Sequence, residues 1–584
     1  MMKIRTYGWI QNPSSFQSLK KVVQIFDTAS QHYQNLKDNL INSIYNEVIR
    51  NNLKDKLINN ENEFTYLELV GTSKNKQGKP PSSRKDAVAD ALIQISIEPQ
   101  QIKSTGKTWT DNWTADGFLR WAVSFNFIKV DREKDTFSIT EKGLAFSQAN
   151  DEEQELDILR TALLAYPPAT QILSLLEENG DYCTKYYLGS KLGFRGEKGF
   201  TSYNEDIMYD WLASSSAVEK KKIKSDIEGT SDKYARGICN WLKNVGFVQT
   251  KQVKRKFQNG QKESLQGYKI TGRGIIALHR SIGHSSNRRI EKFIMWEFFA
   301  TDGHNRDYIR SRRANIVKLL ISTISFKNLV SEMRNNGFQD PEDIFLSDID
   351  GLRLFGLRIE LKNNKFRLLD KICDFSIPKL NLTEELRDKV IEEQKAIFLQ
   401  KTKLPLSYIE LLEIARDGKR SRDFELITME LFKNIYKINA SILGGARKPD
   451  GVLYMPEFGV IVDTKAYADG YSKSIAQADE MIRYIEDNKR RDPSRNSTKW
   501  WEHFPTSIPA NNFYFLWVSS VFVNKFHEQL SYTAQETQTV GAALSVEQLL
   551  LGADSVLKGN LTTEKFIDSF KNQEIVFAPS ILHS

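Results

Sequence analysis

GGARKPDGVLYMPEFGVIVDTKAY, residues 444–467, is the stretch of this chain that most directly indicates a fold and a chemistry. A short apolar run, GVLY, follows Asp450, and a longer one, FGVIV, leads into Asp463 and Lys465. Alternate side chains of a strand point to the same face, so Asp463 and Lys465 are predicted to project together from the strand's end. Asp450, on the neighbouring strand across a short turn, can reach the same place. The stretch therefore predicts two carboxylates and one lysine gathered at one edge of a sheet.

Two carboxylates beside one lysine are the groups that metal-dependent hydrolysis of a phosphodiester requires. Asp450 and Asp463 are expected to hold a hard divalent cation, Mg²⁺, with waters completing its octahedron. Lys465 would orient a metal-activated water or help to deprotonate it. Glu425, on a predicted helix upstream, is a candidate to support the metal ligands, although ordinary helix acidity explains it equally well. The alternative for the whole stretch is a surface strand pair with incidental charges, because this spacing also occurs by chance.

The composition is that of a multidomain globular chain. Its 584 residues are 40% hydrophobic and 27% charged, and single cores rarely exceed ~250–300 residues, so three or four domains are expected. No apolar run approaches the ~18 residues of a membrane helix, and the N-terminus lacks an apolar signal core. The cysteines share no metal-ligand spacing and are expected to be reduced, buried thiols of a cytoplasmic protein. They are Cys183, Cys239 and Cys373.

Other cofactors lack their sequence signals. The seven histidines show no paired spacing, which argues against a zinc site. There is no GxxxxGK(S/T) motif and no Gly-rich strand-to-helix turn, so no nucleotide cofactor is expected. The Gly-rich stretch 189–200 has no apolar strand before it and is predicted to be a loop, one that could face phosphates.

Charge is distributed unevenly along the chain. Residues 381–584 hold 25 Lys+Arg and 28 Asp+Glu, whereas residues 1–380 hold 57 and 46. A basic N-terminal half suits a polyanion, because each neutralised phosphate releases condensed counterions. Charge alone is weak evidence, but it points to the N-terminal half as the part that would meet nucleic acid.

One pattern recurs three times in this basic half: an amphipathic helix, an apolar corner, a short strand, a polar tip and a second strand. The first two copies both end in Ile-Thr-x-x-Gly, at 139–143 and 270–274. A helix followed by a β-hairpin is the outline of a winged helix-turn-helix, a DNA-binding module. Three unrelated helix–hairpin joins are the alternative. The copies span residues 117–146, 234–278 and 348–369.

The expected architecture is multidomain. Three α+β, winged-helix-like DNA-recognition subdomains precede an α/β domain of the PD-(D/E)xK nuclease type with a central mixed sheet. The third subdomain is expected to dock this nuclease domain. The expected boundaries are 1–150, 151–290 and 291–378 for the subdomains, 379–387 for a linker and 388–584 for the nuclease domain.

Several segments resemble the FokI-type IIS restriction endonucleases, and together they extend over essentially the whole chain. Besides residues 444–467, the C-terminal segments that resemble the family's cleavage domain are YIELLEIARD (408–417), WWEHFP (500–505) and GAALSVEQLLLGAD (541–554). The N-terminal segments that resemble its recognition half are KIRTYGWIQNP (3–13), DNWTADGFLRWA (111–122) and EGTSDKYAR (228–236). By this resemblance Asp450, Asp463 and Lys465 match the family's catalytic triplet.

The resemblance implies a type IIS-like enzyme that binds a short asymmetric duplex site, GGATG-like, and cuts both strands outside it with Mg²⁺. It also implies a bacterial, cytoplasmic enzyme accompanied by a separate methyltransferase that protects the host. Two alternatives stay open from the residues alone. One is a non-catalytic winged-helix regulator, and the other is a relative that nicks one strand.

Seven residues fall where the family's recognition subdomains meet DNA. Their types suit base reading, because Arg or Lys pairs with guanine, Asn or Gln with adenine and Glu with cytosine. Ordinary alternatives exist, such as a turn at Asn12-Pro13 or a core position for Trp113. The segment before Glu228 departs from the family, because Ser225-Asp226-Ile227 lacks both the Asn and the Trp that the family has there, and one base contact therefore lacks its counterpart. The seven are Gln11, Asn12, Arg84, Gln100 and Trp113 in the first subdomain and Glu228 and Lys233 in the second.

Asp479 and Arg483 lie four residues apart on a predicted helix after the catalytic strand. Their default interpretation is an intrahelical surface pair worth ~0.3–0.5 kcal/mol. The resemblance instead implies that two cleavage domains pair through them across a twofold axis. One active site cuts one strand, so a double-strand break requires two sites and favours a transient homodimer.

Overall fold

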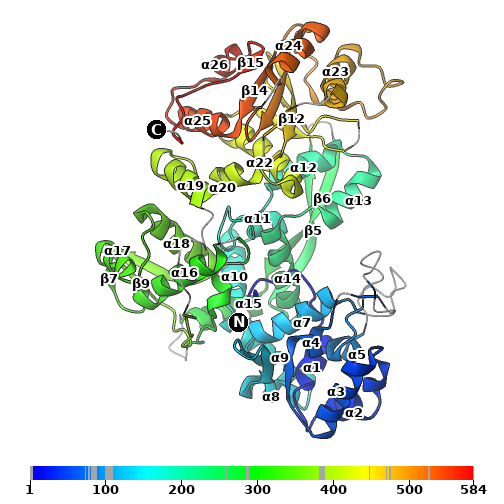
Figure 1. The fold of residues 1–584 in the computed structure, drawn as a ribbon, viewed down its shortest axis with the longest axis vertical. Helices are drawn as coiled ribbons and strands as arrows, with labels where there is room; N and C mark the ends of the chain where they lie inside the picture. The colour runs from blue at the N-terminus through cyan, green and yellow to red at the C-terminus, as the bar shows by residue number, and fades with distance from the viewer. Residues whose placement is uncertain are drawn as a thin grey trace.

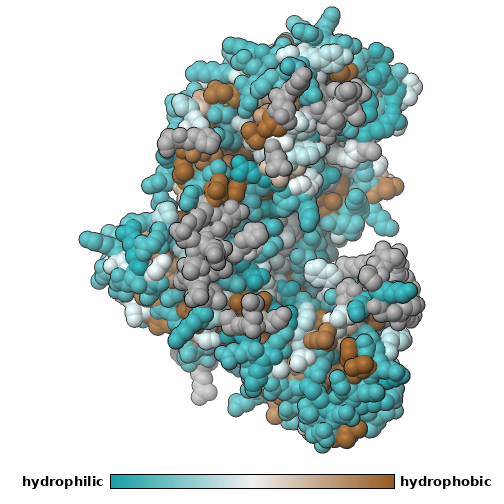
Figure 2. Space-filling view, in the orientation of Figure 1, coloured by the Kyte–Doolittle hydropathy of each residue, from teal (hydrophilic) through white to brown (hydrophobic). Residues whose placement is uncertain are grey.

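The computed structural model shows an elongated molecule with the N-terminal half below and the C-terminal domain above (Figure 1). Only the backbone is described at residues 389 and 475–479. The visible face is mostly hydrophilic, with apolar residues in separate patches (Figure 2). The residues that the structure describes are 4–72, 74–75, 79, 88–98, 110–257, 260–283, 289–303, 305–379, 389–445, 447–468, 470–472, 475–523 and 526–582.

Each of the three N-terminal subdomains contains a three-stranded antiparallel sheet with the same strand order. A hairpin follows a helix, and an upstream strand of two or three residues pairs with the hairpin's second strand. This is the winged-helix arrangement that the three sequence repeats predict, and the prediction is confirmed. The sheets are β1(Glu63–Thr65)-β3(Thr136–Ile139)-β2(Ile128–Asp131), β4(Cys183–Thr184)-β6(Lys262–Ile270)-β5(Val248–Lys256) and β7(Ile324–Ser325)-β9(Lys365–Leu368)-β8(Ile359–Lys362).

Helices supply most of the remaining structure in this half. The helix before each hairpin is α7 (Asn112–Ser124), α14 (Thr230–Asn244) and α18 (Glu342–Phe355). The first subdomain also contains α1 (Phe16–Gln24), α2 (Gln31–Asp38), η1 (Leu40–Ser43), α3 (Glu47–Ile58), α4 (Tyr66–Val70), α5 (Leu92–Ser96) and α8 (Glu141–Ser147). The second contains α9 (Glu152–Ala165), α10 (Pro167–Asn179), α11 (Lys185–Gly189), α12 (Glu205–Ser214), α13 (Ala217–Asp226) and α15 (Gly272–Ile282), and the third η3 (Trp296–Phe299), α16 (Arg306–Leu320) and α17 (Phe326–Asn335).

The repeated Thr-x-x-Gly sequence ends each of the first two wings in the same way. Thr271 caps α15, since its hydroxyl accepts from the backbone N of Gly274 and donates to the carbonyl of Gly246. A Cβ on Gly274 would overlap the carbonyl oxygen of Phe247, so only glycine fits. Thr140 makes the equivalent cap on α8. The repeated sequence therefore marks the junction at which the last strand of the wing ends and the next helix begins.

The C-terminal domain is built on a six-stranded mixed sheet, as predicted. Strands β10 to β12 are antiparallel and β12 to β15 are parallel. Along β12, Val460 and Val462 join the apolar cluster on one face, whereas Ile461 joins the cluster on the other. The strand order is β10 (Asn439–Ile442), β11 (Gly451–Tyr454), β12 (Gly459–Lys465), β13 (Phe513–Ser519), β14 (Gly541–Ser545) and β15 (Gln573–Glu574).

Helices cover both faces of this sheet. Those of the first face are α22 (Ser421–Asn434), α25 (Val546–Leu557) and α26 (Thr563–Asp568), and those of the second are α23 (Ile475–Arg490), η6 (Trp500–His503) and α24 (Phe526–Thr537). The domain begins with α19 (Lys389–Lys401), α20 (Leu406–Ile409), α21 (Leu411–Ile414) and η5 (Gly418–Arg420).

Two apolar cores cross the expected boundaries. One cluster runs through all three N-terminal subdomains, where Trp9 contacts Phe200 and Phe355. A second cluster joins α12 of the second subdomain to the C-terminal domain, through Trp211 and Leu212. The C-terminal domain therefore rests on the second subdomain as well as on the third, whose α18 contacts α19.

Three further expectations can be compared with the structure. Cys183 and Cys239 are buried free thiols, but Cys373 is only partly buried, because it lies in an irregular segment after the third wing. Residues 190–200 form turns, as expected, with Gly196 lying against Ser407 of the C-terminal domain. No helix in the described ranges is long and apolar enough to cross a membrane. Most of the expected linker, 380–387, lies outside the described residues.

Candidate functional site

The strand pair β11 and β12 brings the three predicted catalytic side chains together. Asp450 directly precedes β11, and its Oδ2 accepts hydrogen bonds from the backbone N (2.7 Å) and the Oγ1 (3.0 Å) of Thr464. Thr464 lies between Asp463 and Lys465 on β12, and the Nζ of Lys465 is 2.8 Å from Oδ2 of Asp463. The three groups therefore meet at the carboxyl end of β12.

Burial gives these groups unusual acidities. It raises the pKa of Asp450 to about 6, aided by the negative charge of Glu425. Burial, and then the charge of Asp450, raise the pKa of Asp463 to about 7. Burial alone would lower the pKa of Lys465, but the Asp463 carboxylate more than offsets this and raises it above its ordinary value. Lys465 is therefore a cation at neutral pH. A protonated lysine cannot accept a proton from water, so Lys465 is better suited to orient a water molecule and to offset the negative charge of a phosphate.

The two carboxylates fit a magnesium ion. Among the described residues, no group of three or more His, Cys, Asp or Glu side chains could hold a metal ion. Mg²⁺ does not need such a cage, because it keeps several waters and binds through one or two carboxylates together with substrate phosphate oxygens. Asp463 is buried and Asp450 is partly buried, and the negative charge of Asp450 raises the pKa of Asp463, so the two carboxylates repel each other. A divalent cation between them would relieve that repulsion.

Of the two glutamates on α22, only Glu425 belongs to this site. Its pKa is raised by burial, is lowered in part by Arg422, which donates to its carboxylate, and is raised again by the charge of Asp463. Glu430 accepts instead from the hydroxyl of Tyr408, 3.1 Å away, on another side of the helix. Glu425 thus lies close enough to Asp463 for its pKa to respond to that charge, as its predicted supporting position requires.

Two further residues of this site, Glu480 and Thr464, were not predicted from the sequence. Glu480, on α23, places Oε2 3.9 Å from the Nζ of Lys465 and contributes to the raised pKa of Asp463. No spacing rule predicts it, because the rotation of α23 against the sheet is set by tertiary packing. Thr464 could have been predicted from the sequence, because it lies between Asp463 and Lys465, the two charged residues of β12.

Three of the predicted DNA-contacting residues line one cleft of about 590 Å³ in the N-terminal half. They are Gln11, Asn12 and Trp113, and Arg120 and Lys198 line the same cleft. Trp113 is 62% exposed, so the alternative of a core position is wrong for it. An exposed tryptophan beside amide and cationic side chains suits a surface that meets bases and phosphates.

Glu228 and Lys233 lie at the start of the helix before the second wing. Lys233 is half-buried on α14. Glu228 is 8% exposed, and its carboxylate is held by Lys185 at 2.6 Å and by Arg236 at 2.8 Å. The charge of Glu228 is therefore already neutralised within the protein. Ser225, at the end of α13, is exposed and donates to the carbonyl of Lys221.

Three predicted residues fall wholly or partly outside the described structure. Arg84 and Gln100 lie outside the described residues, as does the side chain of Asp479. Arg483 lies on α23 with its guanidinium 5.3 Å from the ring centre of Tyr484.

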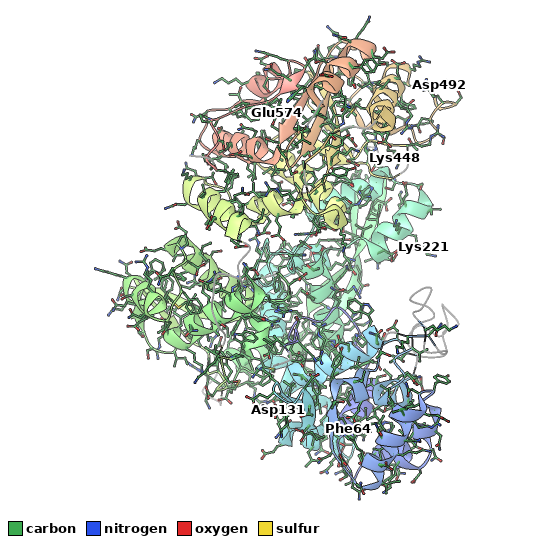
Figure 3. All side chains as sticks on the ribbon, viewed as in Figure 1. Phe64, Asp131, Lys221, Lys448, Asp492 and Glu574 are labelled. Carbon is green, nitrogen blue, oxygen red and sulfur yellow. The ribbon has the colours of Figure 1, made fainter. Side chains whose placement is uncertain are left out.

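The second subdomain touches the C-terminal domain close to Asp450. Lys448, two residues before Asp450, is 2.9 Å from Glu219 on α13. Tyr203 donates to Asp423 on α22, at 2.6 Å. Figure 3 shows Lys448 above the helix that carries Lys221, at the edge of the second subdomain.

Family models match successive parts of the chain. They are described as the first subdomain of the FokI recognition domain (residues 5–149), its second subdomain (155–286), the FokI D3 domain (299–364) and the FokI cleavage domain (388–576). Together they account for most of the sequence.

Relatives and solved structures match along nearly the full length. Type II restriction enzyme FokI of Planomicrobium okeanokoites is 41% identical over 98% of this chain and 100% of its own length. Type II restriction enzyme StsI of Streptococcus sanguinis is 30% identical over 94% of this chain and 91% of its own. The structures of FokI alone and of FokI bound to DNA, 39% and 40% identical, superpose with TM-scores of 0.87 and 0.90, each covering 98% of this chain and 100% of the other. The chain therefore belongs to the FokI family of type II restriction enzymes and is a site-specific DNA endonuclease.

Proposed function

We propose that this enzyme is type IIS-like. The N-terminal half, residues 1–378, binds a short asymmetric duplex site, and the domain from 388 onward hydrolyses both strands at a fixed distance outside that site with Mg²⁺. The observation that carries this proposal is the cluster of Asp450, Asp463 and Lys465, in which Asp463 is buried and the other two are partly buried. A cluster of three charged groups that is largely removed from water is costly to keep unless it has a function. A regulator without catalysis would gain nothing from it.

Within the catalytic centre each side chain has a separate proposed task. Asp450 and Asp463 hold the Mg²⁺, which when bound polarises the scissile phosphate and lowers the pKa of a water. Thr464 fixes the Asp450 carboxylate through two hydrogen bonds. Lys465 keeps a positive charge where a phosphate oxygen gains negative charge in the transition state. Glu425 supports the site by keeping it negative, not by binding the metal.

DNA reading is proposed to be shared by the first two subdomains. Trp113 and the amides of Gln11 and Asn12 line the cleft that would receive the DNA site. Lys233 is proposed to contact a guanine, because an ammonium group can donate to guanine N7 and O6. Arg84, Gln100 and Glu228 are proposed for the same surface by family resemblance. The site is proposed to be GGATG-like, with Ser225 removing one of the family's contacts. A separate methyltransferase would then protect the same sequence in the host.

Cutting both strands is proposed to require two copies of the cleavage domain paired through Asp479 and Arg483. The variants Asp479→Arg and Arg483→Asp should each fail to linearise a plasmid, because like charges would face each other across the twofold axis. Mixed together they should regain cutting, since each Arg would then face an Asp. Both variants should bind DNA as wild type does. Full activity of either reversal alone at dilute enzyme would show that this helix is not the interface.

Cleavage of a supercoiled plasmid tests the proposed function as a whole, provided that the plasmid carries the sequence that the enzyme binds. With Mg²⁺ we expect linear product, and with EDTA no cutting at all. Nicked circles that accumulate without linear product would support a strand-nicking relative instead. Cutting that persists in EDTA would contradict the proposed metal site.

A further inference from the structure

The N-terminal arm, residues 4–13, passes between the two helices that precede the first two wings. It contacts each helix at a glycine that occupies the same repeat position, ten residues before a phenylalanine. A Cβ on Gly117 of α7 would overlap the carbonyl oxygen of Asn12. A Cβ on Gly237 of α14 would lie 3.1 and 3.2 Å from the carbonyl oxygens of Ile10 and Gln11. The backbone of the arm is therefore seated closely against both helices.

The side chain of Asn12, at the arm's tip, is held by α14. Tyr234 of α14 lines the same cleft as Gln11 and Asn12 of the arm. Arg236, one helical turn beyond Lys233, donates from Nη1 to Oδ1 of Asn12 at 3.0 Å. The same guanidinium donates from Nε and Nη2 to the two carboxylate oxygens of Glu228, at 3.1 and 2.8 Å. One side chain thus joins Asn12 of the first subdomain to Glu228 of the second.

The contact fixes which way the Asn12 amide faces. A guanidinium has only donors, so the atom that faces Arg236 must be the amide oxygen. The amide nitrogen of Asn12 then points away from Arg236, and Asn12 is exposed at the cleft. It offers donors to the cleft, which suits an acceptor in the major groove such as a purine N7 or guanine O6.

We propose that Arg236 is a positioning residue for base recognition. It orients the Asn12 amide and ties that orientation to Glu228, so that the base pairs read by the arm and by the second subdomain are read as one unit. The proposal rests on the proposed DNA-reading roles of Asn12 and Glu228. A simple phosphate contact is the competing role for an arginine here. It fits less well, because three donors of the guanidinium are already committed to these two residues.

The positioning role of Arg236 can be tested with the full chain by selecting bound duplexes from a randomised pool. The selection is done in EDTA so that no DNA is cut. Arg236→Gln should lose discrimination at two base pairs, the one that Asn12→Ala affects and the one that Glu228→Gln affects. Each loss should be roughly ten- to a hundredfold, the discrimination that a good base contact supplies. Arg236→Lys should not restore it, because an ammonium cannot hold both partners in the geometry of a fork. The double variant Asn12→Ala/Arg236→Gln should lose no more at the Asn12 base pair than Asn12→Ala alone.

Arg280→Gln is the matched control, since Arg280 is exposed at the end of α15 and does not line the cleft. It removes the same charge and should keep the wild-type base preference. If Arg236→Gln weakens binding to all sequences alike and keeps its preferences, Arg236 is a phosphate contact and the proposal is wrong. If Asn12→Ala itself changes no base preference, the reading role of the arm is wrong, and the role of Arg236 falls with it. Equal thermal unfolding of Arg236→Gln and wild type will show that the loss is not a loss of fold.

Discussion

At the scale of a residue, Thr464 shows how the neighbouring strand positions the carboxylate of Asp450, a proposed metal ligand. Its backbone N and its hydroxyl both donate to Oδ2 of Asp450. Thr464→Val removes the hydroxyl and keeps the branched shape, whereas Thr464→Ser keeps the hydroxyl. We expect the Val variant to lose about 10- to 100-fold in Mg²⁺ affinity or cleavage, as for other groups that orient a metal ligand. The Ser variant should stay close to wild type. Magnesium titrations of plasmid cleavage will measure both, and equal rates in the two variants would remove Thr464 from the mechanism.

The raised pKa of Asp450 also has a consequence for stability. An unfolded Asp titrates near ~3.9, and the folded carboxyl at about 6. The contribution of Asp450 to the free energy of unfolding is therefore fully present below pH ~4, and it is lost as the pH rises through about 6. Asp450→Asn should thus abolish cleavage and yet stabilise the metal-free cleavage domain at pH 8, by on the order of 2–3 kcal/mol. Calorimetry in EDTA should show the gain shrinking toward pH 4. If Asp450→Asn unfolded more easily than wild type at pH 8, the ionised Asp450 carboxylate would not be destabilising, which would contradict its raised pKa.

The grouping of Asp450, Asp463 and Lys465 could be predicted because strand geometry is periodic over two residues. Asp463 and Lys465 share a face whatever surrounds them, and Asp450 follows from a short turn. Glu480 and Arg236 could not be predicted in this way. Their roles depend on how a helix is rotated against another element, which is fixed by packing between residues distant in sequence.

At the scale of an element, the joint after each wing makes a direct prediction. Gly274→Ala places a Cβ against the carbonyl of Phe247, whereas Gly272, in the same helix, has open space around it. We expect Gly274→Ala to cost ~1–3 kcal/mol, as overpacking does. Gly272→Ala should be neutral or stabilising by up to ~1 kcal/mol, because alanine favours a helix. Thermal unfolding of the two variants and wild type will measure the difference, and equal effects would mean that the joint tolerates a side chain.

The hairpins and the helices before them were predictable, since their strands are long enough to show alternation and their ends carry a repeated signal. The third strand of each wing was not. β4 and β7 contain two residues each, at Cys183–Thr184 and Ile324–Ser325, which is too short for any periodicity. These strands form only because the hairpin offers them an unpaired edge.

At the scale of the whole molecule, the order of the domains and the uneven charge were visible in the sequence. The seating of the domains was not. The cleavage domain shares an apolar core with the second subdomain, and Lys448 pairs with Glu219 within two residues of Asp450. Such contacts join residues more than two hundred positions apart, and no local pattern encodes them.

The central claim is that one part of the chain chooses the DNA and another part cuts it elsewhere. The most direct test maps both events on the same duplex, which carries the selected site within a longer flank. The footprint of Asp450→Asn locates binding, and sequencing of the ends made by wild type with Mg²⁺ locates cutting. We predict a footprint over the site and both cuts at one fixed distance outside it. Cuts within the footprint, or cutting by Asp450→Asn, would contradict the account.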